Sequence, residues 1–138
     1  MKEQLEKGLS PCIGFCSTTY GDDFCRGCYR SFRQVIGWTT LPLSEKMDYF
    51  QEISVLAENL MQDKVDIFDE DIFNQSCKRY GVTIYPQLNK YYHLLLLMQK
   101  GYVRFIDEGM GVRLLSNNKK WIDLYKWVDH QIFNLIQK

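Results

Sequence analysis

Apolar residues recur at helical spacing in two long stretches of the chain. Between residues 44 and 62 they fall on one face of a helix, with Ser44 as N-cap and Glu45 in the first turn. That face is formed by Met47, Phe50, Ile53, Ala57, Leu60 and Met61. Residues 118–137 repeat the pattern and predict a final helix. Its apolar face comprises Trp121, Leu124, Tyr125, Val128, Ile132, Leu135 and Ile136.

The region between these helices alternates short apolar runs with turn residues. Residues 65–68 predict a short strand, and Asp69 is placed to cap a helix that ends at Gly81. A further helix is expected over residues 86–99, opened by a proline and stopped by Gly101. Residues 102–106 and 112–115 then flank a glycine-containing turn, which predicts a β-hairpin.

Residues 29–36 predict a short helix nearer the N-terminus, closed by Gly37. We expect Phe32, Val35 and Ile36 to face inward and Arg30, Arg33 and Gln34 to face solvent. The fold class is therefore α+β and mostly helical. We predict two parts, a metal-binding module over residues 1–43 and a helical domain with one β-hairpin over residues 44–138.

Composition and charge narrow the function classes. Hydrophobic residues make up 46% of the 138-residue chain, enough for a core without disulfides, and the formal net charge is zero. Zero net charge argues against a surface that binds nucleic acid strongly overall. The two halves differ, however, because residues 1–77 carry seven Lys and Arg against thirteen Asp and Glu, whereas residues 78–138 carry ten against four. The basic half is a candidate surface for an acidic partner.

The strongest chemical signal is a group of cysteines near the N-terminus. Cys12 and Cys16 form one close pair and Cys25 and Cys28 a second, with a glycine inside each pair, Gly14 and Gly27. Thiolate pairs on short loops suit zinc or an iron–sulfur cluster. Because all four positions are cysteine, a closed structural site is favoured over a catalytic zinc site with an open position. We therefore predict one metal centre on these four residues, whose metal the sequence leaves open.

Disulfides and redox chemistry are the alternatives for these thiols. The first residues lack the apolar segment of a secretory signal, so we expect a cytoplasmic protein with reduced cysteines. A thioredoxin-type role for Cys25 and Cys28 would leave Cys12 and Cys16 unexplained. The fifth cysteine, Cys77, lies among Ile72, Phe73 and Tyr80 and is predicted to be a buried small hydrophobe, with a redox or fifth-ligand role as the alternative.

The cysteine segment resembles a known family. Ser10–Cys16, Cys25–Arg30 with its Cys-Arg-Gly-Cys-Tyr-Arg sequence, and Gly37-Trp38 followed by Leu43–Lys46 are similar to a family of small bacterial domains of unknown function labelled "predicted Fe-S protein". The resemblance covers about residues 10–53. This chain has Ser31 and Gln34 where the family tends to have Thr and Glu. The resemblance implies a metal centre on the cysteines and no particular activity.

A second resemblance concerns residues 44–116. The element order, with residues 98–105 reading Met-Gln-Lys-Gly-Tyr-Val-Arg-Phe, is similar to a winged helix at the point where its recognition helix enters the wing. That resemblance implies nucleic-acid contacts from basic residues, with a solvated basic edge as the alternative. The candidate residues are Lys90, Lys100, Arg104, Arg113, Lys119 and Lys120. The leucine-rich second half of the helix at 86–99 is expected to be core.

These patterns favour a non-enzymatic function. The sequence contains no phosphate-binding loop, dinucleotide fingerprint or nucleophile elbow, and no small-molecule substrate is evident. His93 lies off the apolar stripe of its helix, and the run Leu94–Leu97 is too short to cross a membrane. The first hypothesis is a metal-binding adaptor or regulatory protein with a protein partner. A nucleic-acid-binding regulator that senses redox state is the alternative, followed by an iron–sulfur electron-transfer accessory.

Overall fold

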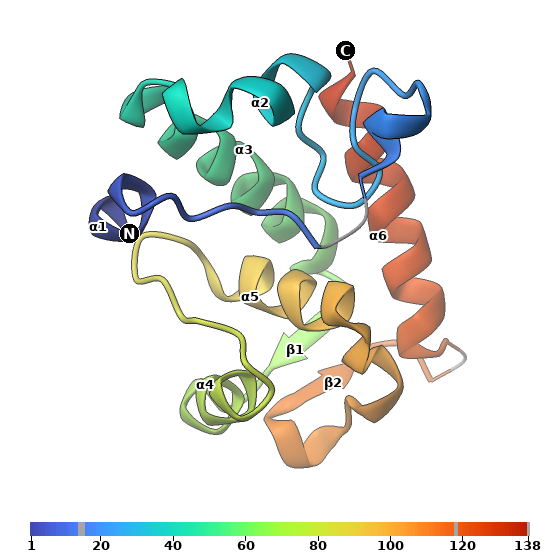
Figure 1. The fold of residues 1–138 in the computed structure, drawn as a ribbon. Coiled ribbons are helices and arrows are strands. Elements are labelled where there is room, and N and C mark those ends of the chain that lie inside the picture. The colour runs from blue at the N-terminus through green and yellow to red at the C-terminus, as the bar shows by residue number, and fades with distance from the viewer. Residues whose placement is uncertain (14–15, 118, 138) are drawn as a thin grey trace.

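A computed structural model describes residues 1–13, 16–117 and 119–137, and this part of the chain is mostly helical. The helices are α1 (Lys2–Glu6), α2 (Phe32–Gly37), α3 (Leu43–Met61), α4 (Glu70–Arg79), α5 (Lys90–Leu97) and α6 (Trp121–Ile136). The strands are β1 (Val65–Ile67) and β2 (Val112–Leu114), which pair antiparallel (Figure 1). The α+β class predicted from the sequence is confirmed at this level.

The helices enclose α5. Figure 1 shows α5 in the middle of the molecule, with α3 on one side and α4 and the two strands on the other, while α6 runs along one edge. Helix α3 packs against both α5 and α6. The N-terminal segment passes across α3 and leads to the cysteine loops, which lie beside the C-terminal half of α6. The cysteines are thus placed against several helices.

One hydrophobic cluster runs through the described residues. It includes Leu5 and Trp38 from the N-terminal part and Ala57, Leu94 and Ile132 from the rest. The predicted stripes of α3 and α6 lie in this cluster because Phe50, Ile53, Met61, Leu124 and Val128 are all buried. The division into residues 1–43 and 44–138 stays a prediction, and the shared cluster shows that both parts contribute to the same core.

Local side-chain hydrogen bonds determine where two of the helices begin. Asp69 caps α4 as predicted, since its carboxylate accepts the Ile72 backbone N–H at 3.1 Å. Helix α5 begins four residues later than predicted, because the Asn89 side chain accepts the Tyr92 N–H at 2.9 Å. The Asn89 amide also donates to the Ser54 carbonyl at 2.7 Å, which fixes the start of α5 to α3. Helix α3 follows Pro42, so the predicted cap Ser44 lies inside the helix.

The predicted β-hairpin is wrong. Residues Met98–Tyr102 and Val103–Phe105 form short helical turns, and β2 pairs instead with β1, Val65 opposite Leu114 and Ile67 opposite Val112. Gly111 has a φ of +81°, and a Cβ there would lie 2.4 Å from the Asp69 carbonyl oxygen. This close approach to the start of α4 directs the following strand toward β1. The wing expected from the winged-helix resemblance is therefore replaced by a two-stranded sheet.

The orientation predicted for the short helix after the cysteines is reversed in part. Phe32 and Ile36 are exposed, at 51% and 69%, whereas Arg30 is buried at 4%. Helix α2 has only six residues and none of them is fully buried, so its apolar residues do little to determine which face of the helix packs against the core. Ser31 and Gln34 instead form a reciprocal capping box at its start, which fixes where α2 begins.

Two positions used in the sequence analysis lie outside the described residues, namely Gly14 inside the first cysteine pair and Asn118, where the final helix is predicted to begin. Among the described residues, every helix is too short or too polar to span a bilayer.

Candidate metal centre

The second cysteine pair lies on a tightly bonded loop. An isolated bridge joins Phe24 to Ser31, and the Cys25 backbone N–H donates to the Arg30 carbonyl at 2.8 Å. Within the loop the Tyr29 N–H donates to the Cys25 carbonyl at 2.8 Å, and Tyr29 has a left-handed φ of 67°. These bonds hold Cys25 and Cys28 side by side on one turn.

Helices α3 and α6 and the segment after α5 anchor this turn. The Tyr49 hydroxyl on α3 donates to the Cys28 carbonyl, and the Gln99 side chain, just after α5, donates to the Gly27 carbonyl at 3.0 Å. The Arg26 guanidinium carbon lies 4.4 Å from the ring centre of Phe133 on α6. The loop is therefore an integral part of the core.

The two sulfur atoms of this loop receive N–H donors. The Gly27 N–H donates to Cys25 Sγ at 3.4 Å, and Arg30 Nε donates to Cys28 Sγ at 3.2 Å. Burial is the largest effect on the pKa of Cys25 and raises it, but hydrogen bonds from backbone N–H groups and from Cys28 together lower the pKa below its ordinary value. Burial raises the pKa of Cys28, and Arg30 only partly opposes this.

The first cysteine pair has different surroundings. Cys12 is exposed and Cys16 is half-buried. The Cys12 N–H donates to Ser10 Oγ at 3.2 Å, and Cys16 Sγ lies 2.8 Å from Thr18 Oγ1. The ends of this segment are better fixed, because the Leu9 carbonyl accepts Trp38 Nε1 at 2.7 Å. Ser17 Oγ accepts the Arg26 N–H at 2.9 Å, which ties the first loop to the second.

The four predicted ligands are only partly brought together. Cys25 and Cys28 share a side-chain hydrogen bond. Across the described residues, no group of three or more Cys, His, Asp or Glu side chains has the arrangement of a metal site, and no two cysteines form a disulfide. The metal centre therefore stays a prediction, and its residues divide into an assembled pair and a separate pair.

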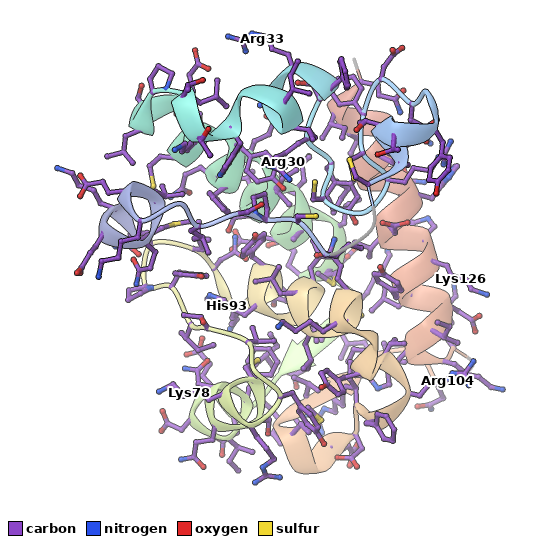
Figure 2. All side chains as sticks on the ribbon, viewed as in Figure 1. Arg30, Arg33, Lys78, His93, Arg104 and Lys126 are labelled. Carbon is purple, nitrogen blue, oxygen red and sulfur yellow. The ribbon has the colours of Figure 1, made fainter. Side chains whose placement is uncertain are left out.

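Two cations next to this loop are buried, which the sequence does not predict. Arg30 is 4% exposed and Lys46 on α3 is 6% exposed. The Arg30 guanidinium carbon lies 4.9 Å from the ring centre of Trp38, and Lys46 Nζ lies 5.8 Å from the same ring. Figure 2 shows Arg30 in the interior and Arg33 at the outer edge of the molecule. The position of Arg30 two residues after Cys28 is a sequence signal that could have indicated its contact with the sulfur. The sequence around Lys46 offers no such signal.

The six basic residues proposed for nucleic-acid contacts separate into groups. Lys90 Nζ lies 3.5 Å from Glu70 Oε1, and Arg113 forms an ion pair with Asp66 in which Nη2 lies 2.9 Å from Oδ2. Lys100 lines a hollow of about 490 Å³ that Cys12 also lines. Arg104, Lys119 and Lys120 share a different hollow of about 490 Å³. The structure therefore gathers three of the six on one surface.

Two other titratable side chains are core residues. His93 is 3% exposed, contrary to its expected place off the apolar stripe, because its Nε2 accepts the Tyr85 backbone N–H at 3.0 Å. Burial lowers the pKa of His93 to about 4. Cys77 is fully buried as predicted, and burial raises the pKa of its thiol to about 12. A neutral, enclosed thiol of this kind is unreactive.

Comparison with known proteins bears only on the cysteine segment. No curated protein and no solved structure gives a significant match to the chain. Residues 10–56 match a family described as "Protein of unknown function (DUF1289)", whose description names neither a metal nor an activity. The matched segment contains the four clustered cysteines, Arg30, Trp38 and Lys46, and it ends inside α3. The match therefore covers the cysteine loops, α2 and most of α3, whereas Gln99 and α6, which also hold the second loop, lie outside it.

Proposed function

We propose that this protein is a non-enzymatic adaptor that holds one metal centre, zinc or an iron–sulfur cluster, on Cys12, Cys16, Cys25 and Cys28. The observation that carries the proposal is the buried Arg30, whose Nε donates to Cys28 Sγ at 3.2 Å. Among the described residues no carboxylate forms an ion pair with Arg30. A buried guanidinium is costly unless an anion lies beside it. The neighbouring sulfur provides that anion only as a thiolate.

A metal ion explains how the thiolate is maintained. Burial raises the pKa of Cys28, so in the absence of a metal the neutral thiol is favoured and Arg30 lacks a counter-charge. Coordination deprotonates a thiol outright. A Zn²⁺ ion on four thiolates carries a net charge of about −2, and a second buried cation, Lys46, lies on the same Trp38 ring as Arg30. Arg30 and Lys46 thus supply charge of the sign and size that a tetrathiolate centre requires.

The loop geometry supports the same proposal. The Gly27 N–H and the Arg30 guanidinium direct donors at the sulfurs of Cys25 and Cys28, which stabilises thiolates. Tyr49 and Gln99 hold the carbonyls of this loop, so the two sulfurs are oriented before any ligand binds. Zinc would supply a structural cross-link to Cys12 and Cys16, whereas a cluster would add electron transfer. The residues around the cysteines act as a scaffold in either case.

Metal analysis with a visible spectrum on anaerobically purified protein tests the proposal. One zinc per chain in a colourless sample, or iron and sulfide in a brown one, would support it and would identify the metal. A full-length, folded protein that contains neither after purification and reconstitution with each would contradict it.

The role of Arg30 has a matched control in Arg33 on the adjoining helix α2. Replacing Arg30 with Met should weaken metal binding about 10–100-fold in a chelator competition, as loss of a partner of metal ligands does. Arg33→Met should leave affinity unchanged, because Arg33 is exposed and pairs with Glu45 at 3.7 Å. Equal affinities of the two variants would remove the argument from Arg30.

A further inference from the structure

A hollow of about 490 Å³ lies between the helical turn at residues 103–105 and the start of α6. Its apolar lining is mainly aliphatic, from Val103, Ile106, Leu114 and Ile122. Val103 and Ile106 are buried, so this part of the lining belongs to the hydrophobic core. A neighbouring hollow of about 410 Å³ also has Leu114 in its wall, so the surface extends along the N-terminal part of α6.

Three cations surround the aliphatic lining. Arg104, Lys119 and Lys120 are exposed and belong to this hollow, and among the described residues no carboxylate lines it. None of the three forms an ion pair within the described part of the chain, in contrast to Lys90 and Arg113. At the amino end of the 16-residue α6, the Asp123 carboxylate accepts the Lys120 backbone N–H at 3.4 Å and offsets the partial positive charge of the helix end. The three cations of this hollow therefore form no ion pair among the described residues, although Asp123 lies next to Lys119 in the wall of the neighbouring hollow.

The lining distinguishes between the two acidic classes of partner. Sites for single-stranded nucleic acid stack bases on aromatic rings, and this hollow has one aromatic residue, Trp121, beside four aliphatic ones. Aliphatic pockets with a charged rim are typical of sites for peptide segments that insert an apolar side chain. The neighbouring hollow is lined by Asp63, Asp123 and Trp127 among others, so we expect the acidic residues of a bound segment at the first hollow only.

We propose that this hollow binds an acidic segment of a partner protein, with an apolar side chain against Val103, Ile106 and Ile122 and carboxylates against Arg104, Lys119 and Lys120. The inference rests on the proposed adaptor function, since it specifies the chemistry of the partner. The hollow is separate from the cysteine loops, so the two proposals can fail independently.

Selection from a phage-displayed library of random dodecapeptides tests the inference on the full chain. We expect enriched sequences in which Asp and Glu flank a Leu, Ile, Phe or Trp. A synthetic peptide of the enriched sequence should lose about tenfold or more in affinity for the double variant Arg104→Glu/Lys119→Glu, because both charges then repel it. Lys78→Glu/Arg79→Glu makes the same charge change on α4, on the opposite side of the view in Figure 2 from Arg104, and should retain the affinity.

Two further measurements complete the test. Ile122→Ser should weaken the peptide while leaving the circular dichroism spectrum unchanged, since Ile122 is only half-buried. An oligothymidylate that binds this site more tightly than the peptide at about 150 mM salt would overturn the inference. So would the absence of acidic enrichment, or a peptide unaffected by the charge reversal. Metal content measured on the same samples shows separately whether the metal centre is present.

Discussion

The two cysteine loops of this protein each have two cysteines with a glycine between them, but their surroundings are very different. Cys25 and Cys28 are buried at 1% and 2% exposure, on a turn bonded to α3 and to the segment after α5, and in contact with α6. Cys12 is exposed, and its neighbours are tied to the body mainly at Leu9 and Ser17. The fold thus organises Cys25 and Cys28, and under the proposal metal binding would organise Cys12 and Cys16.

The largest effect on the free energy of unfolding is expected from Cys28→Ala. The variant removes the sulfur that accepts Arg30 Nε and leaves a buried guanidinium without an anion, which typically costs about 3–5 kcal/mol. Unfolding by denaturant should show this loss, together with the loss of bound metal. Cys77→Ala is the control, since it removes another buried thiol but should retain the metal. Retention of both metal and stability by Cys28→Ala would show that the second loop is not the organised half.

Acid should destabilise the body independently of the cysteines. Burial lowers the pKa of His93 from 6.5 to about 4, so between these pH values the unfolded chain binds a proton that the folded chain excludes. The contribution is fully present above pH 6.5 and is lost as pH falls toward 4, amounting to about 3 kcal/mol.

Denaturant unfolding of chelator-treated protein at several pH values measures this effect. His93→Gln keeps an acceptor for the Tyr85 N–H and should flatten the profile over that range. An equally steep profile in the variant would assign the acid sensitivity to other groups, the cysteine loops included.

The smallest effect on stability is expected from Cys12→Ser. Because Cys12 is exposed, the substitution should change the unfolding free energy of chelator-treated protein by no more than about 0.5 kcal/mol. Metal affinity should nevertheless fall, since one of the four ligands is lost. A chelator-treated Cys12→Ser protein as unstable as Cys28→Ala would remove the distinction between the two loops.

The sequence predicts the helices whose apolar pattern extends over many residues and the helix whose N-cap contact lies within a few residues. The stripes of α3 and α6 span many turns, and Asp69 caps α4 through a contact three residues away. The pairing of β1 with β2 was missed because it joins segments far apart in the chain, for which the alternating pattern names no partner. The close approach of Gly111 to the Asp69 carbonyl, which directs that pairing, is likewise visible only in three dimensions.

The candidate site was predictable in its cysteines and not in its charges. The close spacing of two cysteines marks them as candidate metal ligands, whereas Arg30 and Lys46 look like ordinary surface cations in the sequence. Their burial depends on Trp38, whose ring lies near both, and on the sulfur of Cys28. The sequence predicts Phe32 and Ile36 to be core residues for the converse reason, since an apolar residue on a six-residue helix does not indicate which face is covered.

Alkylation of individual cysteines, followed by mass spectrometry with and without a chelator, tests the central claim most directly. In the metal-loaded protein we expect Cys12, Cys16, Cys25 and Cys28 all to resist alkylation, although Cys12 is exposed in the structure. After chelation, Cys12 and Cys16 should react first and Cys25 and Cys28 more slowly, with the buried Cys77 unreactive throughout. A Cys12 that reacts equally fast before and after chelation would contradict a centre shared by the two loops.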